Sequence, residues 1–110
     1  MSDLQFYVVN FSFPDIENQL AAYKQFIEYA EGGYPDDNFE GFEMFARLHM
    51  PQNGSGVVIC RASGSSALFK HFAPWRAQFG MELDIEPAMG CDEAVAMHKA
   101  LFAEAEGKES

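Results

Sequence analysis

The sequence is poor in cysteine and in basic residues, and each shortage argues against a class of protein. Only Cys60 and Cys91 occur among 110 residues, and two cysteines do not make the disulfide framework on which small secreted domains depend. Lys and Arg number 7 against 17 Asp and Glu, which gives a net charge of -10. Such a chain repels phosphate backbones and anionic lipid surfaces, so we expect neither nucleic-acid nor membrane partners.

The sequence also lacks a long apolar run and an N-terminal targeting signal. No apolar stretch approaches the roughly 20 residues that a membrane-spanning helix needs. Residues 1–4 show no basic start followed by an apolar core. We therefore expect a single domain over residues 1–110 in the cytoplasm, with a polar tail at residues 104–110 that frays.

Apolar residues are abundant, and their spacing changes along the chain in a regular order. They make up 48% of the sequence and include 11 Phe. Strand-like runs cover residues 4–13, 42–50, 56–62 and 81–86, and residues 34–41 form a loop. Helical spacing begins after Asp15, after residues 63–66 and after Asp92. This βαββαβ order with an added C-terminal helix predicts an α+β fold whose antiparallel sheet has helices on one face.

The expected core follows from the same periods. The first helix carries an apolar stripe at steps of four, three, four and three residues: Ile16, Leu20, Tyr23, Ile27 and Ala30. Combining this stripe with the second helix and the strands, we expect six residues between helices and sheet: Leu20, Ile27, Leu48, Cys60, Phe72 and Leu83. His71 lies beside the apolar stripe of the second helix, so we expect it at the surface.

Period-two alternation divides the strand residues between the two faces of the sheet. In residues 42–50, strict alternation turns Ala46 and Leu48 toward the helices and Arg47 and His49 away from them. The second face is then expected to mix aromatic, polar and charged side chains: Phe45, Arg47, His49, Arg61, Glu82, Asp84 and Glu86. Charges on such a face need partners.

Three stretches resemble a known family. They are residues 7–14 (Tyr-Val-Val-Asn-Phe-Ser-Phe-Pro), the pair Pro74-Trp75, and residues 79–87 (Phe-Gly-Met-Glu-Leu-Asp-Ile-Glu-Pro). They are similar to DUF3303, a bacterial family of unknown function in the dimeric α/β-barrel superfamily. The resemblance implies a ferredoxin-like monomer that forms a homodimer through its sheet face. It also implies that Tyr7 and Phe11 share the second face, and it implies no activity.

These assignments lead to one candidate site and one alternative. The candidate is a pocket on the sheet face, at the dimer interface, for a small organic acid or an apolar carbonyl compound. Its predicted lining is Tyr7, Phe11, Phe45, Arg47, His49 and Arg61. In the alternative, Arg47 and Arg61 pair with carboxylates across the interface and no ligand binds. The candidate carboxylates are Glu82, Asp84 and Glu86.

Three classes of function remain open from the sequence. The first is an uncharacterised small-molecule-binding protein. The second is a cofactor-free monooxygenase or isomerase, by analogy with the superfamily alone, with His49 as the weak candidate for a catalytic base. The third is a structural homodimer without a ligand. The spacing of His and Cys predicts no metal site, and no pattern predicts a cofactor.

Overall fold

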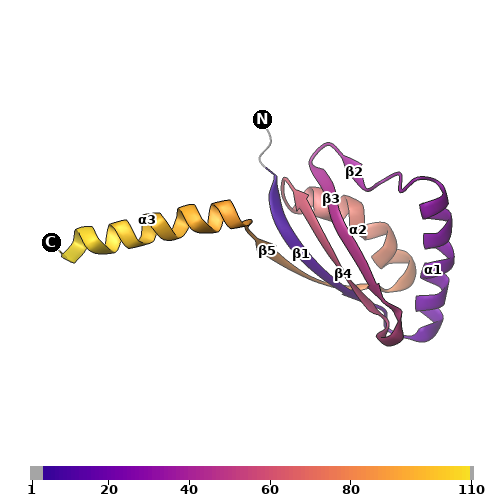
Figure 1. Ribbon diagram of the computed structural model, residues 1–110. Helices are drawn as coiled ribbons and strands as arrows, with labels where there is room; N and C mark the ends of the chain where they lie inside the picture. The colour runs from indigo at the N-terminus through magenta and orange to yellow at the C-terminus, as the bar shows by residue number, and fades with distance from the viewer. Residues whose placement is uncertain (1–3, 110) are drawn as a thin grey trace.

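The computed structural model describes residues 4–109, in which five strands form one sheet and two helices cover one of its faces (Figure 1). The helices and strands in chain order are β1 (Gln5–Ser12), α1 (Ile16–Glu31), β2 (Asn38–Phe39), β3 (Phe42–Met50), η1 (Pro51–Asn53), β4 (Ser55–Ala62), α2 (Ser65–Phe79), β5 (Glu82–Ala88) and α3 (Cys91–Glu109). The predicted α+β class is confirmed. The short strand β2 lies where the sequence predicted only a loop.

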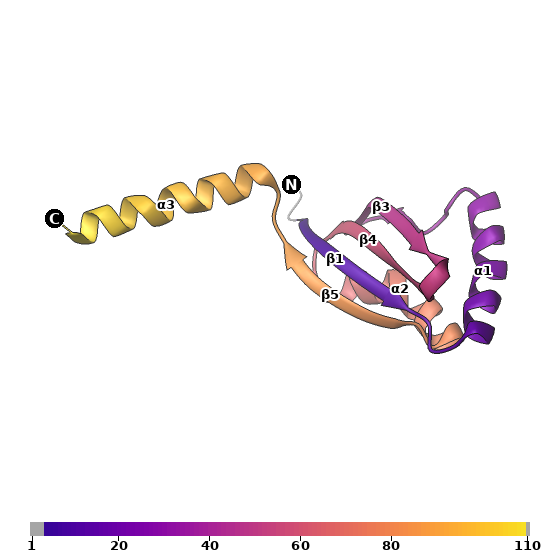
Figure 2. The same cartoon turned by 60° about the horizontal axis from the view of Figure 1, so that its bottom comes forward.

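The strands lie in the order β2-β3-β4-β1-β5, and every neighbouring pair is antiparallel. The connections through α1 and α2 both pass over the same face, so the opposite face carries no helix (Figure 2). This arrangement is consistent with a ferredoxin-like fold. We refer to the two sides of the sheet as the helix face and the open face.

The core lies between the helix face and the two helices. Its largest fully buried side chains are Val9, Phe42 and Cys60. The core prediction is confirmed for Cys60 and for Phe72, which is 5% exposed, and Leu83 packs against the same cluster. Complete burial of one large apolar side chain contributes roughly 1.5–3 kcal/mol to the free energy of folding. These residues therefore contribute strongly to the stability of the domain.

The core prediction is wrong for Leu20, Ile27 and Leu48, which are 58%, 57% and 63% exposed. In α1 the buried residues are Gln19 and Ala22. The helix therefore presents its aromatic residues to the sheet and its aliphatic stripe to the surroundings. Aromatic rings bury more apolar area than aliphatic side chains, and this difference favours the observed rotation of the helix.

A β-bulge in β3 overturns the predicted faces of Arg47 and His49. Met44 lies opposite Cys60 and Ala46 lies opposite Ile59, so Phe45 is an additional residue without a partner in β4. An extra residue reverses the alternation of every side chain that follows. Arg47 and His49 therefore lie on the helix face, opposite Val58 and Gly56, whereas Ala46 and Leu48 lie on the open face.

The two aromatic residues of β1 were also assigned to the wrong face. Tyr7 pairs with Cys60 and Phe11 pairs with Gly56, both on the helix face. The remaining predictions for the open face are correct. Phe45 at the bulge is 64% exposed there. The open face also carries Arg61 of β4 and three carboxylates of β5, namely Glu82, Asp84 and Glu86. Each of them pairs with a residue of β1 that points to the same face.

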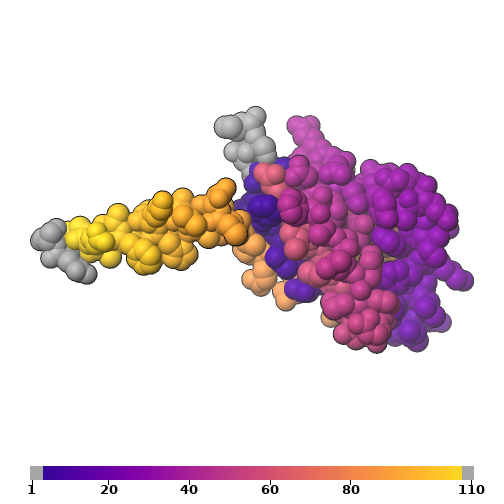
Figure 3. All heavy atoms as spheres, viewed as in Figure 1, coloured from indigo at the N-terminus to yellow at the C-terminus, as the bar shows by residue number. Residues whose placement is uncertain are grey.

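The helix α3 projects away from the sheet, as the space-filling view shows (Figure 3). The longest dimension of the chain is 62 Å and its radius of gyration is 17.8 Å, against about 13 Å for a compact chain of this size. The helix continues through residues 104–109, where its polar composition led us to expect fraying. Within residues 4–109, no helix has the length and apolar character needed to cross a membrane.

Candidate functional site

A cavity of about 40 Å³ lies between α1, α2 and the helix face of the sheet. Its floor is buried and includes Ala22, Val58 and Phe72, and its rim is partly exposed between α1 and α2. The full lining is Phe11, Phe13, Ala22, Tyr23, Phe26, Tyr29, Arg47, His49, Val58, His71, Phe72, Trp75 and Met81. A cavity needs roughly 10–15 Å³ to hold one water molecule, so this cavity admits only a few non-hydrogen atoms.

Aromatic rings from three elements form most of the wall. In α1, steps of three residues bring Tyr23, Phe26 and Tyr29 toward the sheet and α2. The centroid of the Phe26 ring lies 4.9 Å from that of His49, and the Tyr29 ring lies 5.7 Å from Trp75. On the floor, Phe11 lies directly over Gly56, where an added Cβ would come within 2.1 Å of the ring. Glycine at this position is therefore required for the observed wall.

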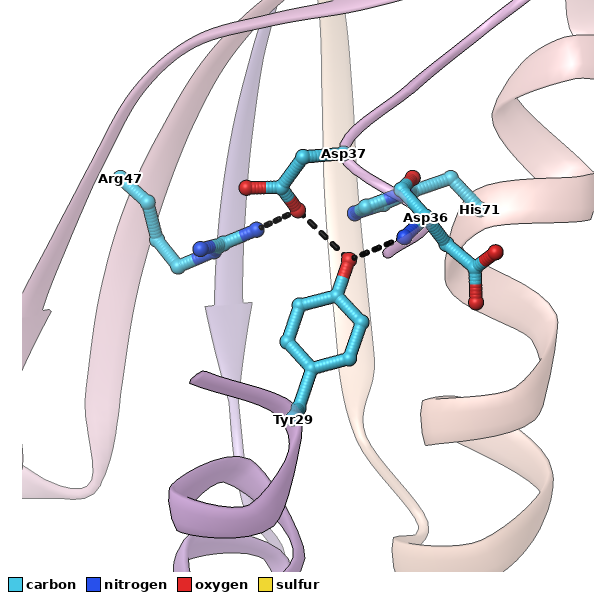
Figure 4. A network of polar contacts seen from close by, with 5 residues as sticks. All are labelled: Tyr29, Asp36, Asp37, Arg47 and His71. Carbon is cyan, nitrogen blue, oxygen red and sulfur yellow. Dashed lines mark hydrogen bonds and ion pairs between the residues drawn. The ribbon is translucent and has the colours of Figure 1, made fainter. Parts of the chain in front are cut away.

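The cationic group of the cavity is neutralised within the chain. The Arg47 Nη2 atom lies 2.5 Å from Asp37 Oδ1, and the Tyr29 hydroxyl donates to the same oxygen at 2.6 Å (Figure 4). The side chains of Arg47 and Asp37 are only 13% and 12% exposed. The guanidinium carbon also lies 5.2 to 5.8 Å from three ring centroids, those of Phe26, Tyr29 and Tyr34. Arg47 is thus held in place as a paired cation.

The Tyr29 hydroxyl is kept protonated by its surroundings. Burial raises the pKa of Tyr29, and its hydrogen bond to Asp37 raises this pKa further. The hydroxyl oxygen of Tyr29 also accepts a hydrogen bond from the backbone N–H of Asp36 at 3.2 Å (Figure 4). Through these two hydrogen bonds, Tyr29 connects the loop before β2 to the cavity wall.

His71 is buried on the floor, at 5% exposure, and not at the surface as the sequence analysis predicted. Its Nδ1 atom lies 2.9 Å from the carbonyl oxygen of Asp36. A carbonyl oxygen only accepts hydrogen bonds, so Nδ1 must carry the hydrogen. The sequence contained a signal for this burial, because His71 follows the buried Leu68 by one helical turn.

His49 lies nearer the rim and forms a pair with Tyr23. The Tyr23 hydroxyl and the His49 Nδ1 atom are 2.8 Å apart. Burial lowers the pKa of His49, and the positive charge of Arg47 lowers it further. Burial is also the main cause that lowers the pKa of His71. Both imidazoles are therefore neutral near pH 7, and the cavity as a whole holds no net charge from these groups.

The lowered pKa values of His49 and His71 predict a pH-dependent stability. The pKa of each imidazole is lower in the folded chain than its ordinary value of 6.5, so the folded chain binds these protons more weakly than the unfolded chain does. Unfolding at mildly acidic pH therefore takes up protons. We expect the free energy of unfolding to fall as the pH is lowered from about 7 to about 5, as measured by urea denaturation.

A matched pair of variants isolates the contribution of the cavity. His71→Phe removes one of the two groups, so its stability should change less with pH than that of the wild type. His98→Phe, on the exposed surface of α3, should reproduce the wild-type profile. The same slope in all three proteins would contradict a role for His71 in this dependence.

Comparison with known proteins places the chain in one family. A scan against protein families matches residues 5–102 to a domain of unknown function, DUF3303. The chain belongs to this family. The resemblance carried by residues 7–14 and 79–87 is thus confirmed. Searches of curated proteins and of solved structures each found no match, so any function of this DUF3303 domain must be argued from its own cavity.

The cavity brings together three of the residues predicted for a site, namely Phe11, Arg47 and His49, and omits the other three. Tyr7 packs against the core, and Phe45 is exposed at the bulge. Arg61 lies on the open face. The residues of α1 and α2 that line the cavity were not predicted, because the predicted site lay on the opposite face of the sheet.

The two arginines are paired within the chain by carboxylates that the sequence analysis did not name. Arg61 Nη1 lies 3.0 Å from Glu43 Oε1, and Arg47 pairs with Asp37. Among the residues that the structure describes, no three His, Cys, Asp or Glu side chains are placed to hold a metal ion together.

Proposed function

We propose that this DUF3303 domain binds a small, largely apolar molecule in the cavity between α1, α2 and the sheet. The observation that carries the proposal is an aromatic cavity whose wall also contains a few fixed polar groups. Small-molecule sites commonly combine an apolar lining with a small number of polar atoms that orient the ligand. The polar groups here are two hydroxyls and three nitrogen-bearing side chains, namely those of Tyr23, Tyr29, Arg47, His49 and His71.

The charges of the wall favour an uncharged ligand. Of the two classes considered from the sequence, an ionised organic acid would need an unpaired cation, but Arg47 is paired with Asp37. Both histidines are neutral near pH 7 and supply no positive charge. An apolar carbonyl compound requires only a hydrogen-bond donor, and the guanidinium has several N–H groups in addition to the one that Asp37 accepts.

The size of the cavity limits how the ligand enters. The cavity, at about 40 Å³, holds a few non-hydrogen atoms. A larger molecule would extend between the aromatic rings of the rim, on Tyr23, Phe26 and Trp75, which are all partly exposed. The proposed ligand therefore has a narrow end that reaches the floor.

Filling the cavity should abolish binding. Ala22 lines the floor and is 2% exposed, so Ala22→Leu places three additional carbon atoms where the ligand would lie. In a screen of small uncharged carbonyl and hydroxyl compounds, we expect compounds that raise the melting temperature of the wild type to leave that of Ala22→Leu unchanged. Urea denaturation without ligand shows whether the variant is folded, since overpacking costs about 1–3 kcal/mol.

Ala21→Leu is the matched control, because residue 21 is the exposed neighbour on the same helix. It should respond to ligands like the wild type. Stabilisation that persists in Ala22→Leu would place the ligand outside this cavity. Absence of stabilisation by any compound would favour the structural homodimer without a ligand.

We also propose that the chain forms a homodimer through the open face, in the manner of a dimeric α/β barrel. Support comes from large apolar side chains on that face, where Phe45 and Leu48 are 64% and 63% exposed. Neither α1 nor α2 lies over that face (Figure 2). A stable interface of this kind buries about 1,200–2,000 Å² in total.

Light scattering at micromolar concentration should give the mass of a dimer, and Leu48→Asp should shift it to that of a monomer. The introduced carboxylate would be buried without a partner at the interface. Leu20→Asp is the control, because Leu20 is similarly exposed, at 58%, but lies on α1. A wild-type monomer, or a dimer that survives Leu48→Asp, would contradict the proposed interface.

The second candidate function is an isomerase acting in the same cavity. It is favoured by one observation, a neutral imidazole on the floor whose Nδ1 carries the hydrogen, which leaves a basic Nε2 on His71. Such a base could remove a proton from the carbon next to a carbonyl group and return it elsewhere in the ligand. Nuclear magnetic resonance in D₂O would detect this as deuterium entering a ketone that the screen shows to bind.

A further inference from the structure

The ring of His71 is held in one orientation on the cavity floor. It stacks on Phe42, with centroids 4.4 Å apart and planes inclined by 12°, and Phe72 meets it edge-on at 4.6 Å. The hydrogen bond from Nδ1 to the Asp36 carbonyl oxygen sets the remaining rotation. A ring fixed in this way presents its other nitrogen, Nε2, in a constant direction.

The acceptor of that hydrogen bond is itself fixed. The backbone N–H of Asp36 donates to the Tyr29 hydroxyl, which also donates to Asp37 (Figure 4). The carbonyl of Asp36 therefore belongs to a loop that α1 holds in place. Because this carbonyl accepts the Nδ1 hydrogen, a neutral His71 has an unprotonated Nε2 that can only accept a hydrogen bond.

The surroundings keep His71 neutral. Burial lowers its pKa, and the charge of Arg47 acts in the same direction, while Asp36 and Asp37 oppose both. Burial is the largest of these causes. Among the residues that the structure describes, no side chain or backbone group donates to Nε2, so this nitrogen can accept a hydrogen bond from a molecule in the cavity that His71 lines.

We infer that the ligand of the cavity carries an uncharged hydroxyl group, as an alcohol, phenol or enol does, and donates it to His71 Nε2. This inference rests on the proposed function and adds the chemical class of the ligand. The aromatic wall accepts an apolar body, and the floor supplies an acceptor. Of the other polar groups, Arg47 has no acceptor atom, and the Nδ1 atom of His49 is already paired with the Tyr23 hydroxyl.

Phenol and toluene are suitable probes, because they have the same number of non-hydrogen atoms and differ in the hydroxyl group. We expect phenol to bind roughly three- to tenfold more tightly than toluene, which is the range for one net hydrogen bond. In protein labelled with ¹⁵N-histidine, phenol should shift the Nε2 resonance of His71, while the Nδ1 resonance stays that of a protonated nitrogen. Toluene should leave the Nε2 resonance in place.

His71→Phe keeps an aromatic ring on Phe42 and removes the acceptor, so it should lose the preference for phenol, because a hydroxyl buried without an acceptor is unfavourable. His98→Phe makes the same change on the exposed surface of α3 and should keep the preference for phenol. If His71→Phe does not fold, the ¹⁵N shift in the wild-type protein still decides the question.

Equal binding of the two probes to the wild type, or an unmoved Nε2 resonance, would overturn the role of His71 while leaving ligand binding in the cavity intact. A preference for phenol that survives in a folded His71→Phe would do the same. Binding of neither probe would also overturn the inference, and the wider compound screen with Ala22→Leu then shows separately whether the cavity binds any ligand.

Discussion

Arg47→Ala should lower the free energy of unfolding by about 3–5 kcal/mol, because it leaves a buried carboxylate without its cation. Arg47 and Asp37 are 13% and 12% exposed in their side chains. Within the part of the chain that the structure describes, the Asp37 carboxylate would keep only the hydrogen bond from Tyr29. The substitution also removes the contacts that the guanidinium makes with the rings of Phe26 and Tyr34. Urea denaturation with an unchanged slope measures the effect directly.

Arg61→Ala is the matched control for this prediction. Arg61 also pairs with a carboxylate on a neighbouring strand, but the side chains of Arg61 and Glu43 are 33% and 44% exposed. An ion pair open to solvent contributes about 0–1 kcal/mol, so the control should change little at protein concentrations where the chain is monomeric. Equal losses in the two variants would show that burial of the Arg47–Asp37 pair does not decide its importance.

Phe42→Ala should have an effect of similar size, about 3–5 kcal/mol, through lost apolar burial and the cavity that remains. Phe42 is 2% exposed at the start of β3. Its ring stacks on Phe39 at 5.2 Å and on His71 at 4.4 Å. The substitution therefore removes a side chain of β3 that packs against both β2 and α2.

Phe69→Ala is the control for Phe42→Ala, since Phe69 is 74% exposed on α2. A surface change of this kind usually alters stability by no more than about 0.5 kcal/mol. A comparison of the two denaturation midpoints tests the assignment of the core. A small effect of Phe42→Ala would mean that the helix face of β3 is wrongly assigned.

The ends of the helices and strands were largely predictable because they depend on near neighbours. The first helix was expected to begin after Asp15, and the carboxylate of Asp15 accepts the N–H of Asn18 at 2.8 Å. Gly80 ends α2 with φ at 64°, where glycine is favoured, so this boundary also depends on a single local residue. The strand predicted at residues 42–50 has the same limits in the structure.

The face of each site residue was not predictable in the same way. Alternation in β3 fails at Phe45, because the bulge arises from the pairing of this strand with β4. The sequence of residues 42–50 alone does not indicate the bulge, yet the bulge turns the side chains of Arg47 and His49 toward the cavity. The rotation of α1 is a similar case, since Leu20 and Phe26 are both apolar and only packing against the sheet and α2 distinguishes them.

The sequence by itself determined the class of the fold, the order of its elements, the family and the acidic charge. These follow from local spacing, from short stretches such as residues 79–87, and from composition. Only the tertiary structure decided where a site can lie. The cavity joins residues as distant as Phe11 and Met81, and the ion pair and hydrogen bonds around Asp36 and Asp37 hold its polar groups. Contacts of that kind depend on strand register and helix rotation, which a single bulge or a few competing side chains can change.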